Sequence, residues 1–280
     1  MKVGPPVEPV AGSSRTGRNL PAAVAVGLAL AAVTIASLYF VKVLFLVVVI
    51  AAVGVGVTEL VRSFEEREIR IPLIPVLVGM AAMLTGAYWG GPAALVGVFA
   101  MTVLVLMIWR MFLGTENYVR DITATVLVVV YPSLLAGFAA LLLAHPTKGA
   151  DLVLVFIATT VASDIGGYFA GISLGRHKMS PTISPKKTWE GFAGSALACM
   201  AVGGWLVAWL LKDDIWKGVL LGAVVVVFAT LGDLVESVIK RDLGVKDMSS
   251  VLPGHGGMMD RLDSLVVALI PVWVLFTLLL

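Results

Sequence analysis

The sequence has few charged residues and a single cysteine. Charged side chains make up 14% of the 280 residues and apolar ones 59%, whereas a typical soluble domain is about 25% charged. So few charges cannot cover the surface of a soluble protein with so apolar an interior. This excludes a disordered chain, a basic nucleic-acid-binding protein and an ordinary soluble enzyme. Cys199 alone cannot form an intramolecular disulfide or a cysteine metal site.

Long apolar runs account for the missing charge. Nine of them are each about 20 residues long, which lets a helix cross the roughly 30 Å of a bilayer core. A membrane barrel would show alternating segments of about 10 residues instead. We therefore predict an all-α, polytopic transmembrane helical bundle in a lipid bilayer. The predicted spans are residues 20–40, 43–60, 71–89, 92–109, 122–143, 152–170, 192–211, 218–238 and 262–280.

The chain is expected to divide into three parts. Residues 1–19 are rich in Pro, Gly and Ser and should form a loose cytoplasmic tail. Residues 20–145 supply the N-terminal transmembrane helices, in which Pro132 should kink the fifth span. Residues 146–280 are predicted to be a transmembrane catalytic region, because more than half of the charged residues fall between 163 and 264.

Basic residues are distributed unevenly between the two sides of the predicted bundle. Four of the 20 Lys and Arg residues fall on the side opposite the N-terminus, and the other 16 fall on the N-terminal side. The four are Lys42, Lys148, Lys212 and Lys217. The positive-inside rule therefore predicts a cytoplasmic N-terminus. The expected location is the plasma membrane of a prokaryote, with the active site facing the cytoplasm.

Four polar residues near the end of the eighth span share one helix face: Asp233, Glu236, Ser237 and Lys240. Their spacing of i, i+3, i+4 and i+7 confines them to about 100° of the helix surface. Ionisable groups at membrane depth cost about 2.5–3.5 kcal/mol each, so this face should point into the bundle. Two interpretations stay open, a functional surface or an internal ion pair that fixes helix packing.

Two further carboxylates, Asp260 and Asp263, share a face at the start of the ninth span. The helix dipole explains one acidic residue there, but not both together with Asp233. Three carboxylates from two neighbouring helices would form a hard-oxygen site. We therefore predict that Asp233, Asp260 and Asp263 bind Mg²⁺ or Mn²⁺. Whether a second cation binds beside it stays open.

The loop between these two helices is basic and rich in glycine. Lys240, Arg241 and Lys246 can donate to phosphate oxygens, and the glycines let backbone N–H groups approach a ligand. His255 has two interpretations, a donor or acid–base group for a phosphate, or a hydrogen bond that holds the glycine turn. A divalent metal with such a loop is typical of phosphate-ester chemistry.

A second polar stretch follows the sixth span. Asp164 lies at the predicted bilayer depth, which makes it a functional candidate. Lys186 and Lys187 could bind a triphosphate, or could simply follow the positive-inside rule. Thr188 could do no more than cap the seventh span.

Two blocks of residues resemble the signature of the phosphatidate cytidylyltransferases, also called CDP-diacylglycerol synthases. The first block comprises Ser237, Lys240-Arg241, Lys246-Asp247, Leu252-Pro253-Gly254-His255-Gly256-Gly257 and Asp260-Arg261-Leu262-Asp263. The second is Ser184-Pro185-Lys186-Lys187-Thr188-Trp189-Glu190-Gly191, preceded by Asp164. The likeness is strong from about residue 164 to residue 264. Earlier residues match only in being hydrophobic helices.

The resemblance implies that CTP and phosphatidic acid react to give CDP-diacylglycerol and pyrophosphate, with a divalent metal and in a homodimer. Nucleic acid is not an expected partner. The residues assigned as catalytic are Asp233, Asp260, Asp263, Lys240 and His255. Those assigned to substrate binding are Asp164, Lys186, Lys187, Arg241, Lys246, Gly256, Gly257 and Arg261.

Two other classes of protein stay as alternatives. Another membrane transferase of phosphate esters would need similar groups. However, the chain lacks the Asp-Gly…Ala-Arg pattern of CDP-alcohol phosphotransferases and the Asp-rich motifs of prenyl transferases. A cation transporter would explain Asp164 and Asp233, but not the lysine-rich loops.

Overall fold

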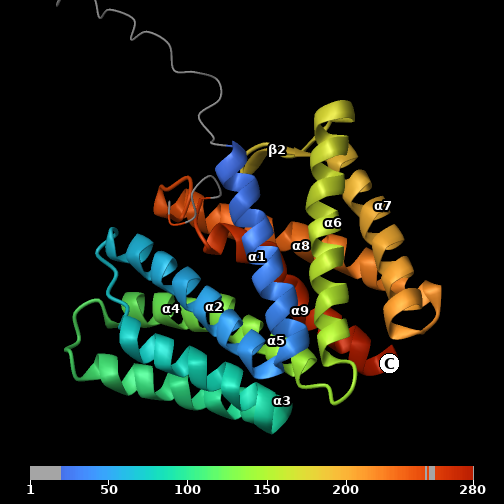
Figure 1. Cartoon of the computed structure of the whole chain (residues 1–280). Helices are drawn as coiled ribbons and strands as arrows, with labels where there is room; N and C mark the ends of the chain where they lie inside the picture. Colours follow the sequence, from blue (N-terminus) through green and yellow to red (C-terminus); the bar gives the residue numbers. More distant parts are fainter. Residues whose placement is uncertain (1–19, 250, 252–255, 280) are drawn as a thin grey trace, which may run out of the picture.

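The computed structural model describes residues 20–249, 251 and 256–279, and most of them are helical (Figure 1). The expected tail at residues 1–19 lies outside the described residues. The helices are α1 (Leu20–Phe40), α2 (Lys42–Glu65), α3 (Leu73–Met111), α4 (Tyr118–Val128), η1 (Val129–Leu134), α5 (Leu135–Leu143), α6 (Gly149–Leu174), α7 (Trp189–Leu206), η2 (Val207–Leu211), α8 (Ile215–Leu243) and α9 (Met259–Leu279).

Seven helical stretches among the described residues are long and apolar enough to cross a membrane. They are Lys42–Glu65, Leu73–Met111, Tyr118–Leu143, Gly149–Leu174, Trp189–Leu211, Ile215–Leu243 and Met259–Leu279. Large apolar side chains such as Ile74 and Leu197 are exposed on their outer faces. Water disfavours such surfaces and lipid does not. The predicted helical bundle of an integral membrane protein is therefore confirmed.

The longest element, α3, is a hairpin of two helices. Its backbone leaves helical geometry at Gly91, where φ is 71° and ψ is −163°, directly before Pro92. A Cβ atom added to Gly79 would lie 2.3 Å from Cγ2 of Thr102, although a straight helix would hold these residues about 35 Å apart. Figure 1 shows the two arms side by side at one edge of the bundle. The third and fourth predicted spans correspond to these arms.

The predicted fifth span is one helical stretch with an irregular middle. Helix α4 passes into the π-helical segment η1, which contains Pro132, and then into α5. Proline has no N–H to donate, so the regular hydrogen-bond ladder cannot continue through it. Pro132 thus disturbs the helix at the position where the sequence predicts a kink.

A short β-hairpin lies between α6 and α7, where the sequence predicted only a polar loop. Strand β1 (Lys178–Ser180) pairs antiparallel with β2 (Ser184–Thr188), with Lys178 opposite Thr188. Thr188 also caps α7, because its hydroxyl accepts a hydrogen bond from the N–H of Gly191 at 3.1 Å. The capping interpretation of Thr188 is therefore confirmed. Among the described residues, the predicted all-α fold is correct except for this one short β-hairpin.

Two of the four lysines expected on the side opposite the N-terminus bind helix ends, and a third binds the loop that follows α5. Lys42 donates to two carbonyl oxygens that follow α5, at 3.0 and 3.1 Å. Lys148 donates to the last carbonyl of η2 at 3.4 Å, and Lys217 to that of Leu279 in α9 at 2.8 Å. Carbonyls at helix C-termini lack helical partners and carry partial negative charge. Lys148 and Lys217 therefore stabilise the ends of η2 and α9.

We expect Gly79→Ala to destabilise the protein by about 1–3 kcal/mol. The added methyl group would meet Cγ2 of Thr102 at 2.3 Å and its Oγ1 at 2.9 Å. Thr102→Ala removes both atoms and should recover much of the loss. Thermal unfolding in detergent of the two single variants and the double variant measures this coupling. Additive effects would contradict the hairpin.

Candidate functional site

A cavity of about 280 Å³ lies between α6, the β-hairpin, α7, α8 and α9. Asp164 of α6, Lys186 and Lys187 of β2, and Asp233 of α8 line this cavity, with Ser264 of α9 beside them. Four residues that the sequence assigns to the site therefore meet at one place, although they come from three separate elements.

Opposite charges face each other in this cavity. Nζ of Lys187 lies 2.6 Å from Oδ2 of Asp233 and donates to the carbonyl oxygen of Thr230 at 3.2 Å. The side chains of Lys187 and Asp233 are 22% and 37% exposed, so the pair is open to the cavity. Asp164 and Lys186 are exposed as well. The cavity thus offers both cationic and anionic groups to a ligand.

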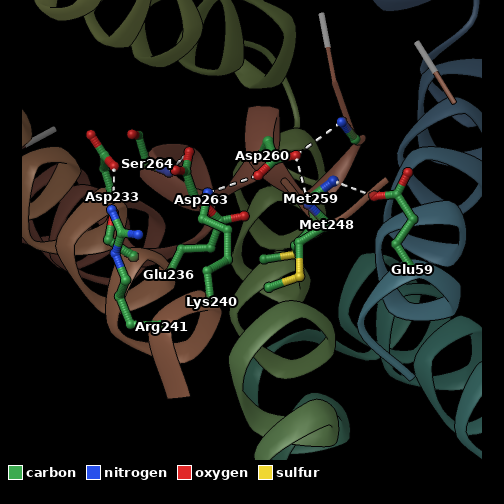
Figure 2. A network of polar contacts seen from close by, with 12 residues as sticks. Glu59, Asp233, Glu236, Lys240, Arg241, Met248, Met259, Asp260, Asp263 and Ser264 are labelled. Carbon is green, nitrogen blue, oxygen red and sulfur yellow. Dashed lines mark hydrogen bonds and ion pairs between the residues drawn. The ribbon is translucent and has the colours of Figure 1, made fainter. Parts of the chain in front are cut away.

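Lys240 lies between two carboxylates next to the cavity (Figure 2). Its Nζ is 2.7 Å from Oδ1 of Asp260 and also donates to Oε2 of Glu236. The side chain of Lys240 is 15% exposed and that of Glu236 is fully buried. The internal ion pair considered for the polar face of α8 is therefore present between Glu236 and Lys240. Asp233, on the same face, binds Lys187 instead.

The two aspartates of α9 are held by backbone groups. Oδ2 of Asp260 accepts hydrogen bonds from the N–H groups of Met248 at 3.1 Å and Gly257 at 2.9 Å. Asp263 is buried and accepts from the N–H of the next residue at 2.6 Å. A Cβ atom on Gly232 would lie 2.5 Å from the carbonyl oxygen of Asp263. Helices α8 and α9 therefore meet backbone to backbone, which brings their carboxylates close together.

The three carboxylates predicted to bind a metal are each engaged by donors. Asp233 binds Lys187, Asp260 binds Lys240 and two N–H groups, and Asp263 binds one N–H group. Within the described part of the chain, no three His, Cys, Asp or Glu side chains converge closely enough to hold an ion. However, Oε1 of Glu236 is buried there and accepts no hydrogen bond from the described residues. The carboxylate oxygens of these residues are ligands that suit a hard cation, although they do not converge on one point.

The other residues assigned to substrate binding lie outside the cavity lining. Arg241, Lys246 and Arg261 are exposed. Nε of Arg241 donates to a carbonyl oxygen in the turn between β1 and β2 at 3.5 Å, which links the end of α8 to the β-hairpin. Gly256 has a φ of 84°, a conformation that glycine adopts without strain. His255 lies outside the described residues.

Three glutamates that the sequence did not assign to the site hold either its polar network or the segments around it. Glu236 binds Lys240, and its place on the polar face of α8 was the available signal. Glu59 of α2 accepts hydrogen bonds at the start of α9, and its signal was an acidic residue inside an apolar span. Glu190 binds the N–H groups of Arg176 and His177 and lies 2.6 Å from Nδ1 of His177. It ties together the two ends of the segment that carries Lys187.

Residues 21–279 match the family model described as the cytidylyltransferase family. The chain belongs to this family. The phosphatidate cytidylyltransferase of Mycobacterium bovis is 42% identical over 286 residues, which cover 97% of this chain and 93% of the relative. That of Mycobacterium leprae is 44% identical over 284 residues, covering 95% and 90%. That of Haemophilus influenzae is 38% identical over 142 residues, covering 48% and 49%.

The cytidylyltransferase match includes the N-terminal helices as well as the two motif blocks. The likeness between residues 164 and 264 is therefore part of a match along nearly the whole chain. The helices before α6, including the one that carries Glu59, belong to the same family architecture as the cavity.

We expect Lys240→Met to destabilise this cytidylyltransferase by about 3–5 kcal/mol, because it removes the counter-charge of the buried carboxylate of Glu236 and of the nearly buried one of Asp260. Lys246→Met is the matched control: Lys246 is exposed, so its loss should change stability by no more than about 0.5 kcal/mol. Thermal unfolding in detergent compares the two variants. Equal losses would contradict the buried pairing of Lys240.

Proposed function

We propose that this chain is a phosphatidate cytidylyltransferase. It transfers the CMP moiety of CTP to phosphatidic acid and releases pyrophosphate, giving CDP-diacylglycerol for phospholipid biosynthesis. The observation that carries the proposal is the identity of 42–44% to proteins of that name over at least 95% of this chain. The geometry agrees, because Asp164, Lys187 and Asp233 line one cavity beside the Lys240 network.

We propose nine spans with a cytoplasmic N-terminus, in the plasma membrane of a prokaryote. This number counts α1 and both arms of α3 as spans. The cavity then lies where α6 and α8 end and α7 and α9 begin. With alternating spans, these ends fall on the side of the N-terminus, where most basic residues lie. CTP could therefore enter from the cytoplasm while the acyl chains of the lipid stay in the bilayer.

In the reaction, a phosphate oxygen of phosphatidic acid attacks the α-phosphorus of CTP in line. The new P–O bond forms as the bond to the β-phosphate oxygen breaks, and pyrophosphate leaves. Both reactants are anions, so cationic groups must offset their repulsion. We assign this role to Lys186 and Lys187 in the cavity and to Arg241, Lys246 and Arg261 around it. The attacking phosphate is already ionised near neutral pH, so it needs no strong general base.

We propose Mg²⁺ or Mn²⁺ as the cofactor, with Asp233, Asp260 and Asp263 as the residues that would hold it. Such an ion would neutralise charge on the phosphates and on the leaving pyrophosphate. The support is the oxygen chemistry of these carboxylates and the unpartnered Oε1 of Glu236 next to them. A second cation and a homodimer are further parts of this proposal.

The deciding experiment incubates the purified protein with labelled CTP and phosphatidic acid in mixed micelles containing Mg²⁺. Release of pyrophosphate that requires both substrates, with formation of CDP-diacylglycerol, is the expected result. Turnover with a different acceptor would replace the proposal with another phosphate-ester transferase. Cation flux in liposomes without turnover would replace it with a transporter.

We expect Asp260→Asn to lower kcat by about 100-fold or more at saturating Mg²⁺, because one of the carboxylates proposed to hold the cation loses its negative charge. Asparagine keeps an oxygen that can accept from the N–H of Met248 or Gly257. The matched control is Asp242→Asn, since Asp242 is exposed at the end of α8, and it should retain normal activity. Near-normal activity of Asp260→Asn would contradict the role assigned to Asp260.

A further inference from the structure

A carboxylate from α2 reaches the start of α9, 200 residues further along the chain. Glu59 is 3% exposed. Its Oε2 accepts a hydrogen bond from the N–H of Met259 at 2.8 Å, and its Oε1 accepts from the N–H of Met258 at 3.0 Å. The hydroxyl of Ser249 also donates to Oε1, at 2.5 Å. Figure 2 shows this side chain entering the polar network from a neighbouring helix.

These contacts make Glu59 a cap for a helix other than its own. The first N–H groups of a helix have no partner within the helix and carry partial positive charge. A residue directly before the helix usually accepts from them. In α9, which begins at Met259, a buried carboxylate of α2 does so and adds a favourable charge.

Glu59 and Asp260 hold the same loop from two sides. Glu59 binds Ser249 and Met258, whereas Asp260 binds the neighbouring N–H groups at 248 and 257. A Cβ atom on Gly257 would lie 2.8 Å from Oε2 of Glu59 and 2.9 Å from Oδ2 of Asp260. A larger residue at 257 would therefore have to displace one of the two carboxylates. A shift of either carboxylate would move the first turn of α9.

We propose that Glu59 is a positioning residue for cytidylyl transfer. It does not line the cavity. It acts through α9, by fixing the first turn and with it the directions of the carboxylates of Asp260 and Asp263. The inference rests on the proposed function. It assigns a role in the reaction to α2, a helix that contributes no residue to the cavity lining.

The test compares Glu59→Gln with Asp121→Asn. Glutamine at position 59 has a single acceptor oxygen, whereas the carboxylate of Glu59 accepts hydrogen bonds from three donors with its two oxygens. Asp121 is a matched control, because it is buried too, accepts from the N–H of Arg70 at 3.2 Å and pairs with Arg110 at 3.0 Å. It lies in α4, and the partners of its side chain, Arg70 and Arg110, are not in α9. Each variant is measured for kcat, for KM of CTP, for thermal unfolding and for hydrogen exchange of a peptide covering 256–262.

Glu59→Gln should lower kcat by about tenfold to a hundredfold, because small displacements of reacting groups are that costly. KM for CTP should stay within about twofold, since the cavity lining is unchanged, and exchange at 256–262 should speed up. Asp121→Asn should lower the unfolding temperature while leaving kcat and exchange at 256–262 unchanged. If Glu59→Gln does not fold, Ser249→Ala removes one of the three donors and should give a smaller change of the same kind.

Three outcomes overturn the proposal. The first is Glu59→Gln with normal kcat and normal exchange at 256–262. The second is a loss of kcat in both variants in proportion to their loss of stability, which would make Glu59 purely structural. The third is unchanged exchange at 256–262 despite a lower kcat. A wild-type protein without turnover would instead refute the proposed function, and the exchange of 256–262 would still report whether Glu59 caps α9.

Discussion

A charge buried among membrane helices needs an opposite charge or a set of donors, and the functional end of this bundle is arranged around that requirement. Lys240 has Glu236 and Asp260, Asp233 has Lys187, and Glu59 has the start of α9. Most of these contacts join separate elements. Because lipid provides little hydrophobic drive between helices, such polar contacts, with close backbone approaches, determine how α2, α8 and α9 are aligned.

The helices were predictable because bilayer thickness sets their length, and hydropathy shows that length directly. The two arms of α3 were predicted separately because Gly-Gly-Pro at residues 90–92 interrupts the apolar run. The β-hairpin was not predicted, since the Ser-Pro-Lys-Lys-Thr sequence of β2 has no apolar alternation to indicate a strand. Its conformation follows instead from contacts such as those of Glu190, which the sequence does not show.

The site residues were predictable in kind but not in pairing. Charge inside apolar sequence marks Asp164, Asp233 and Asp260 whatever the fold. Helical spacing placed Asp233 and Lys240 on one face about 100° wide, yet Asp233 faces the cavity and Lys240 faces α9. Which neighbour each side chain on this face points toward depends on how the helices pack, and the spacing in the sequence does not show it. The same holds for Glu59, whose partners are some 200 residues away.

The pairing of Lys187 with Asp233 links the proposed binding of phosphate to that of a cation. The carboxylate of Asp233 holds the amine of Lys187 in place when no substrate is bound. If a substrate phosphate bound Lys187, Asp233 would lose its counter-charge. A divalent cation that arrives with the triphosphate would restore the balance. Under the proposed function, charge balance would therefore favour binding of CTP together with a divalent cation over binding of either one alone.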